Sequence, residues 1–111
     1  MGREPLSPEM LGLVAERFRA LAEPARLQIL QALRGGELAV GDLVEATGMG
    51  QANVSKHLQL LLGRGYVARR KDGLYSYYSL ADRTVFQLCD IMCGQLAQQT
   101  AHRRRIVARR A

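Results

Sequence analysis

The stretch from Gly48 to Leu80 constrains the fold of this chain more than any other part of it. Its sequence is GMGQANVSKHLQLLLGRGYVARRKDGLYSYYSL. Gly48 and Gly50 suit a turn and a helix cap, because glycine tolerates backbone angles that other residues avoid. Apolar residues then recur at the spacing that buries one stripe of a helix, namely Val54, Leu58, Leu61 and Leu62. The stretch therefore predicts a tight turn followed by an amphipathic helix.

This helix has a short, polar outer face. A rotation of about 100° per residue places Ala52, Lys56 and Gln59 opposite the apolar stripe. Further polar residues flank that face: Gln51, Asn53, Ser55 and His57. Amides, a hydroxyl and an ammonium group can contact base edges in the major groove and hold the phosphates beside it. Any solvated helix has polar residues outside, so this face alone does not identify a function.

A basic hairpin follows the helix directly. Residues 66–71 and 74–80 are expected to form two strands, and Asp72-Gly73 between them suits a tight primed turn. Cationic side chains crowd one side of its tip: Arg69, Arg70 and Lys71. A charge run is usually a solvated surface, but a cationic hairpin directly after a polar-faced helix is a specific combination. It predicts the wing of a winged helix-turn-helix, lying along a phosphate backbone or in a minor groove.

This order of elements predicts binding to duplex DNA, with the helix reading bases and the wing holding the backbone. The residues expected to contact DNA are Gln51, Asn53, Ser55, Lys56, His57, Gln59, Arg69, Arg70, Lys71 and Tyr75.

The remaining segments predict a mainly helical fold, with the hairpin as its small β-structure. The expected elements are a helix from Ser7-Pro8, a helix from Pro24, a minor strand at 37–39, a brief helix at 41–46 and a long final helix from Asp82 towards Gln99 or beyond. The helix from Pro24 is expected to bury Leu27, Ile29, Leu30 and Leu33.

The first and last helices have more apolar surface than one small domain can cover. The first has a single apolar stripe of Met10, Leu13, Val14, Phe18 and Leu21. The last has two neighbouring stripes, one of Val85, Leu88, Met92 and Leu96 and one of Phe86, Cys89, Cys93 and Ala97. Because a chain of 111 residues gains from burying more apolar surface, we expect a homodimer formed through these two helices.

Length and charge agree with one DNA-binding domain over residues 1–111, with its core at about 9–99. The formal net charge of +6 favours a polyanionic partner. Five arginines and no acidic residue lie between 91 and 111. We expect the basic tail, residues 101–111, to be disordered.

Several classes of protein are not expected. No run approaches the roughly 18 apolar residues of a membrane span, and the N-terminus lacks the pattern of a signal peptide. The two cysteines do not form a disulfide framework, which favours the cytoplasm. No carboxylate pair or phosphate-binding glycine loop stands in a catalytic context, so neither an enzyme nor a required cofactor is expected.

Residues 21–80, from LAEPARLQIL to YYSL, resemble the ArsR/SmtB (arsenic-repressor) family of bacterial winged-helix regulators. The likeness covers roughly residues 10–98, and the run NVSKHLQLLLGRGYV is its most specific part. The resemblance implies a homodimer, usually a repressor, that binds an imperfect palindrome near a promoter. An inducer, often a metal or metalloid, releases it. The family's recognition positions match Gln51, Asn53, Ser55, Lys56 and His57.

The two best-known metal sites of that family are not matched. Soft-metal sensors resemble ELCVCDL where this chain has ELAVGDL at residues 37–43, so both thiolates are missing. Zinc sensors use an Asp-x-His pair and a later His-x-x-Glu, and the matching positions here are Asp82, Thr84, Gln95 and Gln98. One carboxylate cannot replace the four ligands of a closed zinc site.

Cys89 and Cys93 lie four residues apart, on one face of the last helix. They are either small packing residues or a thiol sensor that binds arsenic(III) or a soft metal, or is oxidised by peroxide or reactive sulfur. His102 is either a third ligand or a solvated side chain.

Two other functions stay open: a regulator of this type without metal or thiol sensing, and a winged-helix protein-interaction module whose basic tail binds nucleic acid.

Overall fold

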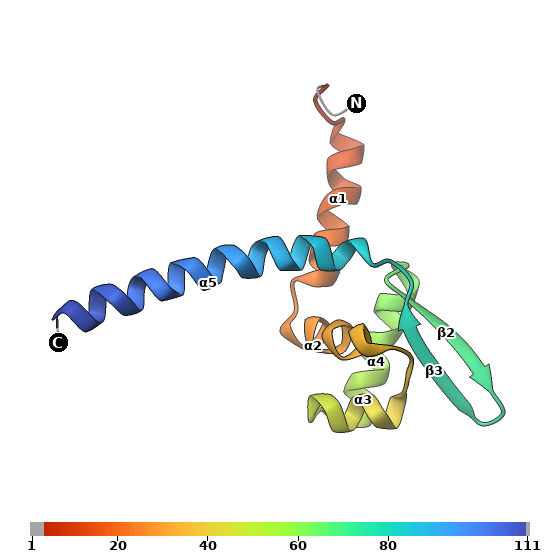
Figure 1. The fold of residues 1–111 in the computed structure, drawn as a ribbon. Coiled ribbons are helices and arrows are strands. Elements are labelled where there is room, and N and C mark those ends of the chain that lie inside the picture. Colours follow the sequence, from red (N-terminus) through yellow and green to blue (C-terminus); the bar gives the residue numbers. More distant parts are fainter. Residues whose placement is uncertain (1–3, 111) are drawn as a thin grey trace. The chain divides into compact units, whose positions relative to one another are not determined.

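A computed structural model describes residues 4–110, and their side chains from residue 4 to residue 101. The elements occur in the order α1 (Pro8–Leu21), α2 (Pro24–Ala32), the 3-10 turn η1 (Leu33–Gly35), β1 (Leu38–Ala39), α3 (Val40–Thr47), α4 (Gln51–Gly63), β2 (Val67–Asp72), β3 (Tyr75–Leu80) and α5 (Thr84–Arg110) (Figure 1). They form two compact units, Met1–Ala81 and Asp82–Ala111. The mainly helical fold with a β-hairpin agrees with the sequence-based expectation.

The starts of the first two helices follow from their first residues. Ser7 Oγ accepts a hydrogen bond from the N–H of Met10 at 3.1 Å, which satisfies one donor of the first turn. Pro8 and Pro24 each stand at the start of a helix, where a missing N–H costs no hydrogen bond. The predicted starts of α1 and α2 are therefore confirmed.

The core of the first unit lies among α2, η1, α3 and α4. Its fully buried side chains are Ile29, Leu30, Leu33, Leu43, Val54, Leu58 and Leu61. The prediction that Leu27 is buried is wrong, since it is 39% exposed. At about 100° per residue, Leu27 lies about a third of a turn from the stripe that Ile29, Leu30 and Leu33 share.

Only one of the two glycines in the turn between α3 and α4 adopts a backbone conformation that favours glycine. Gly48 follows α3 with a φ of 73°, in the left-handed region, and its N–H donates to the carbonyl oxygen of Val44 at 2.9 Å. Gly50 caps α4 with an ordinary φ of −68°. α4 then packs against α2 and α3 through the predicted stripe, as the second helix of a helix-turn-helix.

The sheet is antiparallel with the strand order β1-β3-β2, and β1 is the minor strand that the sequence predicts. Asp72 pairs with Tyr75, so the loop consists of Gly73 and Leu74, one residue later than predicted. Gly73 has a φ of 61°, and no non-glycine residue in the described chain has a positive φ. A single positive φ at the first loop position is typical of a type II′ turn, whereas a type I′ turn at Asp72-Gly73 needs two.

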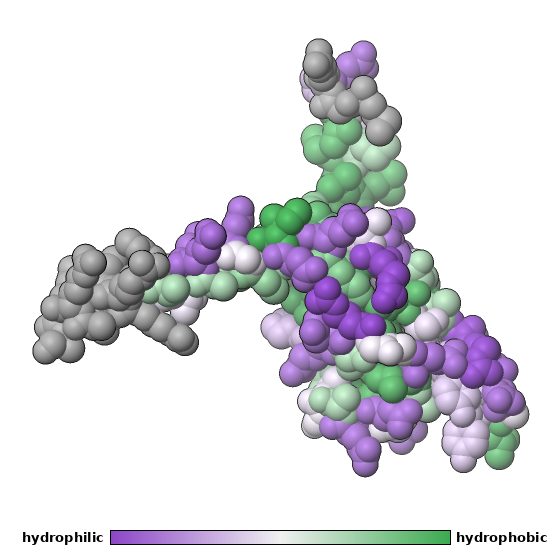
Figure 2. Space-filling view, in the orientation of Figure 1, coloured by the Kyte–Doolittle hydropathy of each residue, from purple (hydrophilic) through white to green (hydrophobic). Residues whose placement is uncertain are grey.

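Much of the apolar stripe of α1 is exposed. Met10 is 46% exposed, Leu13 58% and Phe18 56%, and Figure 2 shows this surface in green on α1. The helix is nevertheless anchored, because the Tyr66 hydroxyl donates to the carbonyl oxygen of Arg17 at 3.2 Å. The guanidinium carbon of Arg17 also lies 5.6 Å from the centre of the Tyr66 ring. The stripe is thus an apolar surface on an anchored helix.

α5 begins near Asp82 and continues beyond Gln99, as the sequence predicts. Asp82 Oδ1 accepts a hydrogen bond from the N–H of Thr84 at 2.9 Å, which caps the helix. The backbone of α5 continues to Arg110, and the disorder expected of the basic tail, residues 101–111, stays a prediction. The residues after Gly94 include no glycine or proline, and alanine and arginine favour a helix. The proposed ligand His102 lies outside the described side chains.

Two apolar residues in the first turn of α5 are buried, whereas the large apolar residues of its middle are exposed. Val85 and Phe86 are 2% and 7% exposed. The large exposed apolar residues are Leu88, Ile91, Met92 and Leu96, each more than half exposed. A single helix has no core of its own, so this surface needs a protein partner to be covered. In the part of the chain that the structure describes, no helix has both the length and the apolar content to cross a bilayer.

Candidate nucleic-acid interface

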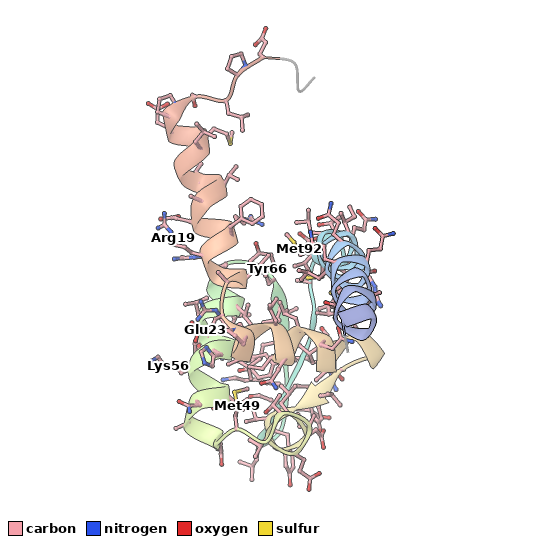
Figure 3. The ribbon with its side chains drawn as sticks, turned by 90° about the vertical axis from the view of Figure 1, so that its left-hand side faces the viewer. Arg19, Glu23, Met49, Lys56, Tyr66 and Met92 are labelled. Atoms are coloured by element: carbon pink, nitrogen blue, oxygen red, sulfur yellow. The ribbon has the colours of Figure 1, made fainter. Side chains whose placement is uncertain are left out.

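The outer face of α4 carries the polar side chains predicted to contact DNA. Its exposed members are Gln51, Asn53, Lys56 and Gln59, and the half-buried ones on its flank are Ser55 and His57. Figure 3 shows Lys56 projecting from α4 away from the core. A helix of this length, about 20 Å, fits the major groove and presents its donors and acceptors to base edges.

His57 differs from the other members because it contacts Arg26 of α2. Arg26 Nη1 lies 3.4 Å from His57 Nδ1, although the two residues are 31 positions apart. Arg26 Nε and Nη2 donate to the carbonyl oxygens of Ala20 and Arg19, at 2.6 and 3.0 Å. Only 13% of the Arg26 side chain is exposed. One guanidinium therefore joins the end of α1, the start of α2 and the middle of α4.

This contact fixes which nitrogen of His57 is available to a ligand. A guanidinium has only donors, so Nδ1 must be the unprotonated nitrogen that accepts the hydrogen bond. Nε2 is then the atom left for a contact outside the protein. The helical spacing of the sequence groups His57 with the DNA-reading residues, but it gives no sign of Arg26. His57 as a DNA contact stays a prediction.

The cationic residues of the wing are divided between the two faces of β2. Side chains alternate along a strand, so Arg69 and Lys71 share one face and Arg70 lies on the other. Arg70 donates from Nε and Nη2 to the two carboxylate oxygens of Glu37, at 3.0 and 2.7 Å. Its guanidinium carbon also lies 4.8 Å from the centre of the Tyr77 ring. Arg70 therefore holds the wing to the segment before β1, a role that the charge run did not reveal.

The ion pair between Arg70 and Glu37 shifts the pKa values of both groups. The hydrogen bond from Arg70 lowers the pKa of Glu37 below its ordinary value, and the attraction to that guanidinium adds to the effect. The hydrogen bond to Glu37 raises the pKa of Arg70 in turn. Both groups are exposed to solvent, so the pair orients the wing more than it stabilises the fold. Arg69 and Lys71 have no hydrogen bond or ion pair within the described residues, which leaves them available for phosphates.

The tip of the wing presents apolar groups. Leu74 is fully exposed and Tyr75 is 65% exposed, and the Tyr75 ring centre lies 6.4 Å from that of Tyr77. The sequence predicts Tyr75 as a DNA contact and misses Leu74, because it places the turn one residue too early. Apolar side chains at such a tip can enter a minor groove.

The comparisons with known proteins decide the family. A model of bacterial regulatory proteins of the arsR family matches residues 23–69. The chain is 45% identical over 86 residues to the HTH-type transcriptional regulator NmtR of Mycobacterium tuberculosis, covering 78% of this chain and 72% of NmtR. It is 45% identical over 74 residues to a probable mercury resistance operon repressor of Streptomyces lividans, covering 67% and 59% of the two chains. The chain belongs to the arsR family.

A solved structure agrees with this assignment. The solution structure of a homodimeric winged helix-turn-helix DNA-binding domain from Mycobacterium bovis, described as a possible ArsR-family transcriptional regulator, matches with a TM-score of 0.75. The two chains are 35% identical, and the match covers 91% of this chain and 94% of the other. The predicted winged helix-turn-helix fold is thus confirmed, and this arsR-family protein is a DNA-binding transcriptional regulator rather than an enzyme.

The cysteines of this arsR-family chain do not form a complete metal site. Cys93 is exposed and Cys89 half-buried, and neither forms a disulfide within the described chain. No group of three or more His, Cys, Asp or Glu side chains suited to a metal ion occurs among the described residues. Two soft sulfur ligands on one helix face do not fit a closed four-ligand site.

The acidic residues of the 37–43 segment serve the fold instead. Glu37 binds Arg70, and Asp42 Oδ2 accepts a hydrogen bond from the N–H of Ala39 at 3.0 Å at the start of α3. Both contacts lie in the segment where soft-metal sensors of this family resemble ELCVCDL.

Proposed function

We propose that this arsR-family protein is a homodimeric repressor that binds a palindromic operator and is released by an inducer. The observation that carries the proposal is the exposed polar face of α4 beside a wing whose Arg69 and Lys71 are unpaired in the described chain. Repression is supported by the Streptomyces lividans relative, whose name is that of an operon repressor. Because a bacterial repressor binds operators in chromosomal DNA, we expect the protein to act in the cytoplasm.

The dimer is supported by apolar surface on α1 and on α5. Leu13, Phe18, Ile91 and Met92 are each more than half exposed. Burying such side chains is worth about 25 cal/mol for each Å² removed from water. The Mycobacterium bovis neighbour is homodimeric. In a two-fold dimer, two copies of α4 would read half-sites about one DNA turn apart, which is why the operator should be palindromic.

Oligomeric state tests the dimer. Leu88→Asp and Met92→Asp place a carboxylate in the proposed apolar interface, which costs several kcal/mol when the charge is unpaired. The exposed neighbour Gln87 gives the control Gln87→Asp. We expect light scattering to find a dimer for the parent and the control and a monomer for the two variants. Dimers of normal mass in all four proteins would exclude these residues from the interface.

The proposed inducer is a thiol-reactive compound that acts at Cys89 and Cys93. Their shared face and the exposure of Cys93 support this role. Binding or oxidation there would move α5 and so change the separation of two recognition helices in a dimer. The double substitution to serine should bind DNA normally and ignore the inducer. A double-serine protein that responds as the parent does would make the cysteines packing residues.

A binding assay with fragments of the protein's own promoter tests the function as a whole. One fragment carries the candidate palindrome and the control carries the same bases with one half-site scrambled. Arsenite, a soft metal ion, peroxide and polysulfide are added in turn. We expect preference for the intact palindrome, reversed by one of these additions. Equal affinity for both fragments would favour a protein-interaction module with a non-specific basic tail, because electrostatic binding alone does not discriminate sequences.

A further inference from the structure

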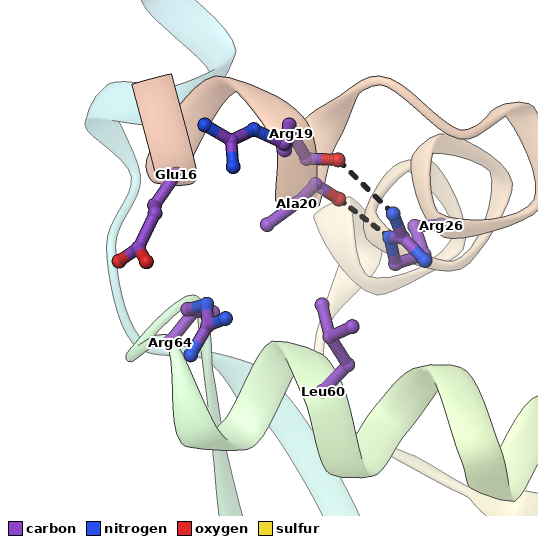
Figure 4. Close-up of a pocket in the computed structure, with 6 residues that line it drawn as sticks. All are labelled: Glu16, Arg19, Ala20, Arg26, Leu60 and Arg64. Atoms are coloured by element: carbon purple, nitrogen blue, oxygen red, sulfur yellow. Dashed lines mark hydrogen bonds between the residues drawn. The ribbon is translucent and has the colours of Figure 1, made fainter. Parts of the chain in front are cut away.

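A pocket of about 120 Å³ lies where the end of α1, the start of α2 and the end of α4 meet (Figure 4). It belongs entirely to the first unit. Its lining comprises Glu16, Arg19, Ala20, Arg26, Leu60 and Arg64. The pocket is thus lined by three guanidinium groups and a single carboxylate, which leave a net charge of about +2.

The arginines of this pocket differ in how they are held. Arg26 is fixed by its hydrogen bonds to the carbonyl oxygens of Arg19 and Ala20, drawn as dashed lines in Figure 4. The guanidinium groups of Arg19 and Arg64 have no hydrogen bond or ion pair within the described chain, and neither has the carboxylate of Glu16. The pocket therefore combines one preorganised guanidinium with two whose donors are unused.

We propose that this pocket binds a small, doubly charged oxyanion, either inorganic phosphate or the phosphate group of a monoester. The charge of the lining matches a dianion. Guanidinium groups bind phosphate oxygens through paired, charge-assisted hydrogen bonds. The volume has room for about four water molecules, which suits a phosphate group and is well below that of an ordinary organic-ligand pocket.

The pocket borders the apolar stripe of α1. At about 100° per residue, Arg19 lies opposite that stripe, whereas Ala20 lies close to Leu13. Glu16 and Arg64 also line a neighbouring pocket that includes Met10, Leu13 and Val14. A phosphate of the DNA backbone is a weaker candidate for the occupant. Arg64 follows the last turn of α4, about 20 Å along the axis from Gln51, whereas recognition helices contact base edges mainly with their N-terminal residues.

An anion in the pocket would act on the recognition helix through Arg26. Of the contacts that Arg26 makes with α1 and α4, that with His57 is the longest, at 3.4 Å. A phosphate oxygen beside Arg26 competes for this donor with a stronger, charged acceptor. His57 Nδ1 then loses its partner next to Lys56 on the DNA-reading face. This second step rests on the proposed function, whereas the binding of the anion does not.

Calorimetric titration of the DNA-free protein tests the site. The probes are inorganic phosphate and glycerol 3-phosphate, with nitrate as the singly charged control and with ionic strength held constant. We expect saturable binding of at least one phosphate probe and none of nitrate. Arg64→Gln and Arg19→Gln should each weaken it about tenfold or more, since a hydrogen bond to a charged group is lost. Glu16→Gln should tighten binding several-fold, because it removes the opposing charge.

Arg83→Gln is the matched control, because it removes an exposed arginine outside the pocket, and it should bind the probe as the parent does. Equal affinity in all four variants, equal weakening by Arg83→Gln, or no saturable binding would overturn the site. Promoter binding with and without the phosphate probe then tests the coupling. Unchanged operator affinity at saturating probe would overturn the action through Arg26 and leave the site intact. Failure to bind any operator would instead defeat the proposed function, and the titration would still decide the site.

Discussion

The outer face of α4 and the wing carry side chains that the sequence assigns to the same task, but the structure treats them differently. On α4, helical periodicity separates buried from exposed residues, and Lys56 and Gln59 are exposed as expected. On the wing, three consecutive cationic residues alternate between two faces, and Arg70 is paired with Glu37. A face of a helix can thus be deduced from spacing, whereas the role of a charge on a strand depends on what lies beside it.

The largest expected effect belongs to α4. Lys56→Ala with Gln59→Ala removes two exposed polar groups from the reading face without touching the core. Specific operator affinity should fall at least about tenfold, because one good base contact is worth about 1–3 kcal/mol. The exposed residue Gln31 of α2 gives the control Gln31→Ala. Fluorescence anisotropy measures the affinity, and unchanged binding by the double variant would remove this face of α4 from the interface.

Substitutions in the wing should weaken the binding of all DNA sequences by a similar factor. Arg69→Ala with Lys71→Ala removes two phosphate-binding groups, so the slope of log K against log salt should become shallower by about one unit for each lost contact. Binding to the palindrome and to the scrambled fragment should weaken by the same factor. A loss confined to the palindrome would show that the wing reads bases or groove width, and the contrast with α4 would disappear.

Substitutions of His57 distinguish a contact to DNA from a structural contact to Arg26. His57→Ala deletes the acceptor for Arg26, whereas His57→Gln keeps an acceptor in a side chain of similar length. Because the contact is long, we expect the loss of stability to lie at the low end of the roughly 0.5–1.5 kcal/mol of a typical intramolecular hydrogen bond, although the donor is a charged guanidinium. Thermal unfolding should show that loss for His57→Ala and a smaller one for His57→Gln. If both unfold as the parent does while operator affinity drops, His57 is a DNA contact and not a support.

Local rules account for what the sequence could predict. The cap at Ser7, the cap at Asp82 and the buried stripe of α4 each depend on residues within one or two helical turns. The contacts between Arg70 and Glu37, and between Arg26 and His57, join residues 33 and 31 positions apart. No spacing rule connects such pairs, because only the packing of α2 on α4 and of β1 on β3 brings them together.

A second group of wrong predictions concerns single residues at the edges of helices or strands that were themselves predicted correctly. The turn lies one residue late because Gly73 alone takes a positive φ, and this places Leu74 at the tip. Leu27 is exposed because it lies beside, not within, the buried stripe of α2. In each case, the type of element is predicted and its edge is not.

The smallest expected effect is that of the pair formed by Glu37 and Arg70, and it depends on pH. Since the hydrogen bond from Arg70 lowers the pKa of Glu37, the pair is complete above the ordinary pKa of a glutamate, about 4.3, and is lost as the pH falls through the lowered value. Glu37→Gln should lower operator affinity only about twofold at neutral pH, because an exposed ion pair contributes little. The NMR signal of Arg70 Nε–H should change on acidification in the parent and in the control Glu45→Gln, and change much less in Glu37→Gln, where only the longer ion pair with Asp72, at 3.7 Å, remains. A signal that titrates identically in all three proteins would mean that Arg70 is not held by Glu37, and its place among the phosphate contacts, beside Arg69 and Lys71, would be restored.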